Sequence, residues 1–175
     1  MCRNINAGIV RHRFTMIELL VVVAILAIAA AIVVPMASSA GSMQLRAAVN
    51  MVAADLEYAK SMSISRGRRY AVVFDKTTET YRVTDASGTT ISHPVKTGFL
   101  YTVDFRDDGR LGQVDIVDVS FDSKNAVSFD SLGSPWSGTG GSATQLNSGV
   151  ITLQAGGITR TVNVEPVTGY ISVSN

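Results

Sequence analysis

The sequence predicts an α+β fold, in which one long N-terminal helix packs on antiparallel β-sheets of about eight short strands. Two observations carry this prediction. Up to residue 67, apolar side chains either run together or recur at three- and four-residue steps, which is the spacing of a helix face. Beyond residue 67 they alternate with polar side chains, which is the spacing of a strand.

Length and composition limit what the chain can be. Its 175 residues have room for one domain plus appendages. A formal net charge of +1 gives no overall electrostatic attraction to nucleic acid. The single cysteine, Cys2, excludes a disulfide framework and a cysteine metal site within the chain. We expect no cofactor and no bound metal.

An apolar run near the N-terminus predicts a membrane helix. No charged side chain lies between Leu19 and Leu45, and residues 19–40 are long enough to span a bilayer. We therefore expect a transmembrane helix over 14–40, preceded by a basic leader over 1–13.

The charges of the leader predict the orientation of the chain. Its arginines are not accompanied by any acidic residue, and basic residues before an apolar span stay in the cytoplasm. The rest of the chain should then lie outside the cytoplasm, attached to the cytoplasmic (inner) membrane by a single span. The leader arginines are Arg3, Arg11 and Arg13.

A cleaved secretory signal peptide is the alternative interpretation of this region. Small residues in the stretch PMASSAG, residues 35–41, could serve as a cleavage site. Two features argue against it: the apolar run is longer than an ordinary signal core, and an acidic residue, Glu18, lies at its start.

The helix should continue as an amphipathic half over 41–67. Most charged residues fall on the opposite side from its apolar positions, and Gly67 is a plausible C-terminal stop. Pro35 should kink or locally melt the helix. The apolar positions are Leu45, Val49, Val52, Leu56, Ala59 and Met62, and the charged ones are Arg46, Asp55, Glu57 and Lys60.

A β-rich domain should occupy 68–175. The segments RYAVVFD and TYRVTD flank Lys76 to Glu79 and predict a hairpin. The Gly-, Ser- and Thr-rich segment 131–149 predicts a loop. Six further strands are expected at 99–105, 114–121, 126–129, 150–154, 159–165 and 170–174.

The sequence gives little support to catalysis. His12 lies in the leader, so a Ser-His-Asp triad would have to use His93, and no nucleophile-elbow motif is present. We expect a protein that is not an enzyme.

The segment DFRDDGRLGQVD, residues 104–115, is faintly similar to a calcium-binding loop. Aligning Gly109 with the loop glycine places Asp104, Asp108 and Asp115 at ligand positions. Arg106 then occupies a position that needs an oxygen ligand, so the segment favours a solvated turn between strands.

Two further features could bind a partner. Arg66, Arg68 and Arg69 could contact DNA phosphates, although basic residues also suit the negative end of a helix dipole. Trp136 could anchor a partner protein or simply cover the sheet.

The segment RFTMIELL, residues 13–20, resembles the signature of type IV prepilins. The resemblance implies that a prepilin peptidase cuts between Arg13 and Phe14, that Phe14 is then N-methylated, and that Glu18 becomes the fifth mature residue. Pro35 falls where many pilins carry a proline. The implied partners are other pilins or pseudopilins, the peptidase, membrane lipid and an inner-membrane assembly platform.

The same resemblance implies a role for Glu18. In such filaments the fifth-residue carboxylate is thought to pair with the N-terminal amine of a neighbouring subunit, here that of Phe14. An apolar surrounding strengthens this attraction. Glu18 and Pro35 are therefore the expected assembly residues.

One residue departs from the prepilin signature. The residue before the cut is usually glycine, and here it is Arg13. The alternative is an uncleaved bitopic membrane protein.

Later segments resemble the GspH/FimT group of minor pseudopilins and minor pilins. They are LEYAKSMSISRGRRYAVVFD, VSFDSLGSP and ITLQAGGITRTVNVEPVTGYISV. This resemblance implies a minor pseudopilin of a type II secretion system, with its globular domain in the periplasm. The alternative is a FimT-like minor type IV pilin for pilus assembly or DNA uptake, with DNA as a weaker candidate partner.

Overall fold

The computed structural model describes residues 15–174, without the side chains of 32–40. Cleavage at Arg13 and Phe14, and the leader 1–13, lie outside the described residues. The chain divides into two compact units, Met1–Ala37 and Ser38–Asn175.

A single helix, α1 (Met16–Arg66), runs through both units. Its backbone is helical without a break across Pro35, so the expected local melting at this proline is wrong. A proline removes only one backbone donor from a helix, and that loss does not end α1.

The end of α1 at Gly67 is confirmed. Gly67 has a φ of +62°, a conformation that glycine adopts at little cost. The N–H of Gly67 donates to the carbonyl of Ile64, and the N–H of Arg68 donates to that of Ser63. These two bonds form a Schellman motif, which satisfies carbonyls that the helix end leaves free.

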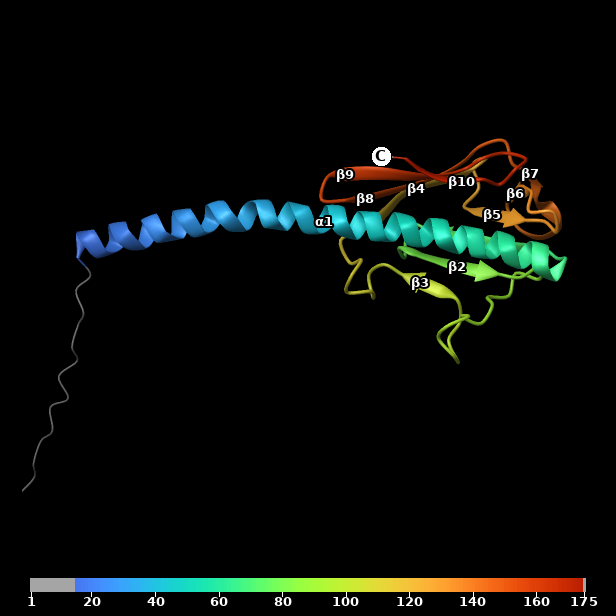
Figure 1. Ribbon diagram of the computed structural model, residues 1–175, viewed down its shortest axis with the longest axis horizontal. Helices are drawn as coiled ribbons and strands as arrows, with labels where there is room; N and C mark the ends of the chain where they lie inside the picture. The colour runs from blue at the N-terminus through green and yellow to red at the C-terminus, as the bar shows by residue number, and fades with distance from the viewer. Residues whose placement is uncertain (1–14, 175) are drawn as a thin grey trace, which may run out of the picture. The chain divides into compact units, whose positions relative to one another are not determined.

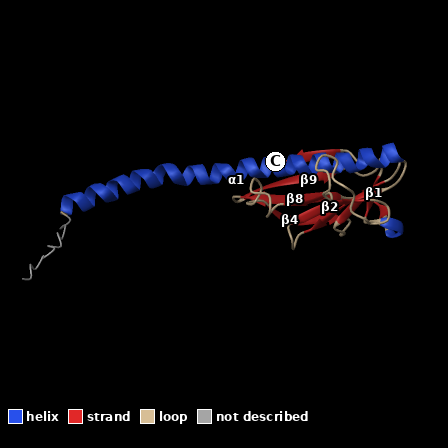
Figure 2. Ribbon diagram, turned by 90° about the horizontal axis from the view of Figure 1, so that it is seen from below, coloured by secondary structure: helices blue, strands red, loops and turns tan. Residues whose placement is uncertain are grey.

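Among the described residues, ten strands form two antiparallel sheets in the second unit (Figures 1 and 2). The six-stranded sheet has the order β3-β2-β1-β5-β6-β7, and the four-stranded sheet has the order β10-β9-β8-β4. The first sheet consists of β3 (Thr102–Asp104), β2 (Thr80–Thr84), β1 (Tyr70–Asp75), β5 (Ala126–Phe129), β6 (Pro135–Ser137) and β7 (Thr144–Gln145), and the second of β10 (Ile171–Ser174), β9 (Ile158–Val164), β8 (Gly149–Ala155) and β4 (Asp115–Phe121).

The α+β prediction is confirmed, and so is the first hairpin, in which Asp75 pairs with Thr80. The prediction of a loop over 131–149 is wrong in part, because β6, β7 and a short 3₁₀ helix (Gly140–Ser142) lie within it. These strands are only three and two residues long. Because glycine and serine give no alternating pattern, these two strands are defined by pairing: β6 pairs with β5, and β7 pairs with β6.

One face of the second half of α1 forms the centre of the hydrophobic core. Figure 1 shows this part of the helix, cyan to green, lying along strands of both sheets. Its side chains belong to one cluster with Val72 and Phe74 of β1 and with Ile151 and Leu153 of β8. The fully buried helix positions are Leu45, Ala48, Val49, Val52, Leu56 and Ala59.

Glu79, in the turn between β1 and β2, also connects the two sheets. Its side chain is buried, and the N–H of Ile116 in β4 donates to its Oε2 atom. The N–H of Phe105 donates to its backbone carbonyl at 3.1 Å, and the guanidinium of Arg106 lies 3.9 Å from Oε1. A buried carboxylate needs such partners, which offset the loss of its hydration.

Gly169 and Gly157 offer a matched test of how closely the turns of the domain are packed. Both have a positive φ, +59° at Gly169 and +80° at Gly157. A Cβ atom at Gly169 would lie 2.7 Å from the carbonyl oxygen of Gly133, whereas one at Gly157 would meet nothing within 4 Å. We expect G157A to lower the free energy of unfolding by about 1–2 kcal/mol, the cost of the backbone conformation. G169A should cost a further ~1–3 kcal/mol because its neighbours must move.

Chemical denaturation of the full chain in detergent, followed by circular dichroism, measures both losses. Equal losses would contradict the close contact between Gly169 and Gly133.

Candidate assembly helix and neighbouring polar sites

The first turn of α1 is capped by Thr15. The N–H of Glu18 donates to the Oγ1 atom of Thr15 at 3.2 Å, and the N–H of Leu19 donates to its carbonyl at 3.1 Å. Thr15 therefore occupies the N-cap, and the negative charge of Glu18 lies where the helix dipole favours it. The Thr-x-x-Glu spacing of Thr15 and Glu18 is a sequence signal for such a cap, and the apolar pattern alone does not contain it.

The side chain of Glu18 is exposed. Within residues 15–174, no basic side chain forms an ion pair with its carboxylate. The carboxylate is thus available to a cation from another chain.

The side chains around Glu18 are apolar and exposed. Large hydrophobic residues from Met16 to Ile28 have between 46% and 91% of their surface accessible, on all sides of the helix. Covering one such side chain is worth about 1.5–3 kcal/mol, so contact with another apolar surface would stabilise this segment. Among the described residues, which omit the side chains of 32–40, no helix is long and apolar enough to cross a membrane.

Two of the three arginines predicted to contact nucleic acid are held within the domain. The Arg68 Nε atom donates to the hydroxyl of Tyr70 at 3.1 Å. The Arg69 guanidinium lies 4.6 Å from the ring centroid of Trp136 and donates to the carbonyl of Gly140 at 3.1 Å. Arg66, in the last turn of α1, is exposed.

Trp136 has a local role in the six-stranded sheet. It is half-buried in β6, covered by Arg69, and its Nε1 atom donates to the carboxylate of Asp130 at 3.1 Å. These contacts support the interpretation of Trp136 as a cover over the sheet.

The helix also contributes a carboxylate, that of Asp55, which the sequence pattern grouped with the charged positions opposite the apolar ones. Asp55 is half-buried, and the hydroxyls of Tyr81 and Tyr101 each donate to it at 2.7 Å. Burial raises the pKa of Asp55, although the two hydrogen bonds favour its charged form. Asp55 is therefore not a freely solvated residue, although the pattern grouped it with the charged positions of the helix.

His93 lies beside this carboxylate but has a structural role. Its ring packs against that of Tyr101 at a tilt of 43°, with 4.6 Å between centroids, and its Nδ1 atom accepts from the N–H groups of Val95 and Lys96. Asp55, His93 and Tyr101 line an open hollow of about 750 Å³. The sequence pattern showed none of this clustering, because Asp55 comes from α1 whereas His93 and Tyr101 come from the distant connection between β2 and β3.

The 104–115 segment forms turns. Asp104 accepts from the N–H groups of Arg106 and Asp107, and hydrogen bonds from Arg110 lower the pKa of Asp108 to about 2. Within residues 15–174, no group of three or more His, Cys, Asp or Glu side chains could hold a metal ion.

The buried position of Asp55 predicts a pH dependence of stability. Because its pKa in the folded chain is above 3.8, the native carboxyl binds its proton more tightly than the unfolded one does. Its contribution to the free energy of unfolding is therefore greatest below pH 3.8, and decreases as the pH rises through the native pKa. Carbon-13 NMR of the Asp55 carboxyl should show a midpoint above 3.8, and D55N should lack this part of the pH dependence.

A matched variant, E57Q, removes an exposed carboxylate from the same helix. The part of the pH dependence that D55N lacks should still be present in E57Q. A carboxyl midpoint for Asp55 below 3.8 would contradict the effect of burial.

Three solved structures share this fold. Two are crystal structures of the type IV minor pilin FimU of Pseudomonas aeruginosa, at 15% and 18% identity and TM-scores of 0.50 and 0.51. They cover 75% and 77% of this chain and 93% and 90% of theirs. The third is the minor pseudopilin EpsH from the type 2 secretion system of Vibrio cholerae, at 9% identity and a TM-score of 0.51, covering 75% of this chain and 96% of its own. No curated protein matches the chain in sequence.

The family described as Type II transport protein GspH matches residues 48–168. This match covers the C-terminal part of α1, from residue 48 onward, and all the strands except β10. The chain therefore belongs to the GspH family, as a pilin-like protein of the type II secretion or type IV pilus class.

Proposed function

We propose that this chain is a minor pseudopilin of a type II secretion system, a structural subunit that assembles through its N-terminal helix into a periplasmic pseudopilus that helps to export folded proteins. The observation that carries the proposal is the exposed apolar start of α1, in which Glu18 is the single charged residue. This segment belongs to a chain whose folded domain matches the GspH family. The family is structural, which supports a role without catalysis.

We propose that residues 14–40 anchor the chain in the inner membrane before assembly, with the β-rich domain in the periplasm. The support is the uncharged run of 19–40 behind a basic leader. A prepilin peptidase then removes 1–13, and Phe14 becomes the methylated N-terminus.

In the proposed filament, Glu18 pairs with the new amine at Phe14 of a neighbouring subunit. The carboxylate is exposed at the first turn of the helix and surrounded by apolar side chains. When neighbouring helices cover these side chains, water leaves and the amine becomes the partner that offsets the lost hydration of the carboxylate.

A minor type IV pilin is the second candidate function. The fold is as similar to FimU as to EpsH, with TM-scores of 0.50 to 0.51 for all three structures. Deleting the gene distinguishes the two: loss of protein export with intact pili supports the pseudopilin, and loss of pili with intact export supports the pilin.

The mass of the N-terminal peptide tests the processing step. We expect the chain from native membranes to begin at a methylated Phe14, because the signature from Phe14 to Glu18 resembles that of cleaved prepilins. Mass spectrometry of the purified protein measures this directly. A chain beginning at Met1 would contradict cleavage and support the bitopic alternative.

Replacing Glu18 tests assembly. Removing one partner of a buried ion pair costs about 3–5 kcal/mol, so E18A should reduce co-purification with other pseudopilins from detergent-solubilised membranes to background. The matched control is E57A, which removes an exposed acid from the same helix, 3.7 Å from Lys60. Equal recovery of the two variants would argue against a role for Glu18.

A further inference from the structure

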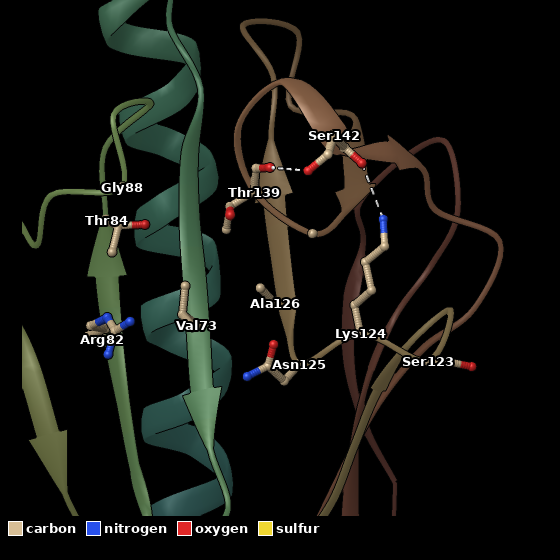
Figure 3. Close-up of a pocket in the computed structure, with 11 residues that line it drawn as sticks. Val73, Arg82, Thr84, Gly88, Ser123, Lys124, Asn125, Ala126, Thr139 and Ser142 are labelled. Carbon is tan, nitrogen blue, oxygen red and sulfur yellow. Dashed lines mark hydrogen bonds between the residues drawn. The ribbon is translucent and has the colours of Figure 1, made fainter.

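The outer face of the six-stranded sheet carries a hollow that the proposed assembly does not use (Figure 3). Val73 of β1 pairs in register with Arg82 of β2 and Ala126 of β5, and all three side chains line it. Because successive side chains of a strand point to opposite faces, this row faces away from the core that holds Val72 and Phe74. We call this the Arg82 hollow; its volume is about 480 Å³.

A buried hydroxyl without a partner lines the Arg82 hollow. Thr84 is 1% exposed, and its Oγ1 atom makes no hydrogen bond to any residue that the structure describes. Figure 3 shows this hydroxyl directed toward β1, across the face of the sheet that the hollow occupies. A buried hydroxyl without a partner costs about 1–3 kcal/mol, so a ligand that accepts a hydrogen bond from Thr84 would offset this cost.

Two cations make the Arg82 hollow electropositive. Arg82 is exposed and forms no ion pair with any described residue. The ammonium of Lys124 donates to the carbonyls of Ser137 and Ser142 at 3.2 and 3.3 Å, and Thr144 Oγ1 lies 3.5 Å away. These three oxygens are uncharged, and no acidic side chain lines the hollow.

The donors available suit a small, planar anion. The guanidinium of Arg82 presents two parallel N–H groups, and Thr84 adds one hydroxyl. The ammonium of Lys124 has three donors, and three acceptors of the protein already lie within reach of them. Lys124 would therefore attract an anion by its charge more than by direct hydrogen bonds. Three donors match the two oxygens of a carboxylate better than the oxygens of a phosphate, and the apolar floor of Val73 and Ala126 accommodates the carbon that bears it.

We propose that the Arg82 hollow binds a carboxylate group, held by the Arg82 guanidinium and the Thr84 hydroxyl. The carboxylate comes either from the end of a peptide or from a free small acid. This inference is independent of the filament role of Glu18.

Binding can be measured on the full chain in detergent micelles by NMR, from the Nε–H signal of Arg82 and the methyl signal of Thr84. The probes are acetyl-triglycine, its C-terminal amide, acetate and inorganic phosphate. We expect acetyl-triglycine or acetate to shift both signals saturably, and the amide to shift neither. Tighter binding of the peptide than of acetate assigns the site to a peptide carboxylate, and equal binding assigns it to small acids.

Two variants test the assigned donors. R82Q should weaken binding about tenfold or more, the loss of a charge-assisted bidentate contact, and T84V should weaken it several-fold. Because the hydroxyl of Thr84 has no partner in the free chain, T84V should fold with unchanged or higher thermal stability.

Each variant has a matched control. Ser128 carries the other buried hydroxyl without a partner among the described residues, but it does not line the hollow. S128A should therefore have unchanged or higher thermal stability, as T84V should. It should bind the probes as the unaltered chain does. R160Q removes an arginine from β9 in the other sheet and should not affect binding. Binding of the amide, tighter binding of phosphate, no binding of any probe, or unchanged binding by R82Q and T84V would each overturn the proposal.

Discussion

The burial of one face of α1 against both sheets is the constraint on which the folded domain depends. The described strands form two sheets that share no ladder of hydrogen bonds, so the sheets are held together mainly through side chains. Leu45, Val52 and Leu56 of the helix contribute to one cluster with residues from both sheets. Each fully buried side chain of this size contributes about 1.5–3 kcal/mol, which makes the stripe on α1 the largest common element of the core. Without it, each sheet would expose its apolar face.

Polar contacts define how α1 lies on this core. An apolar stripe alone tolerates sliding and rotation, whereas hydrogen bonds are directional. Asp55 accepts from tyrosines of two segments, and Ser63 donates to the carbonyl of Ala59 while accepting from the N–H of Tyr70. Lys60 donates to the carbonyl of Gly169 at 3.0 Å, which connects the helix to the last turn of the domain. These bonds are distributed along the helix and fix both its rotation and its end.

Local periodicity was sufficient to predict the helix, its buried stripe, its end at Gly67 and the first hairpin, because each depends on neighbouring residues. It did not predict features that depend on contacts between segments far apart in the sequence. Asp55 counts as polar in any pattern, and only the tyrosines of β2 and of the segment before β3 make it a buried acceptor. The strands β6 and β7 exist through pairing with β5 and with each other. For the same reason the Arg82 hollow had no signal in the sequence, since its lining residues come from β1, β2, β5, the turn between β4 and β5 and the loops after β2 and β6. Glu18 could be proposed from the sequence because its signal lies within a few residues, and its role in assembly stays a prediction.

Asp55 and Glu18, two carboxylates of α1, differ in where their hydrogen-bond and ion-pair partners come from. Asp55 finds its donors within the chain, and the cost of its burial is offset when the domain folds. Glu18 has the helix dipole, worth about 0.3–1 kcal/mol, but no basic partner among the described residues. Its cost appears only when other helices cover the apolar side chains around it. In the proposed filament, apolar area therefore supplies most of the affinity between subunits. A helix displaced by one turn would bury nearly the same area but leave Glu18 without its cation, so the carboxylate determines the register.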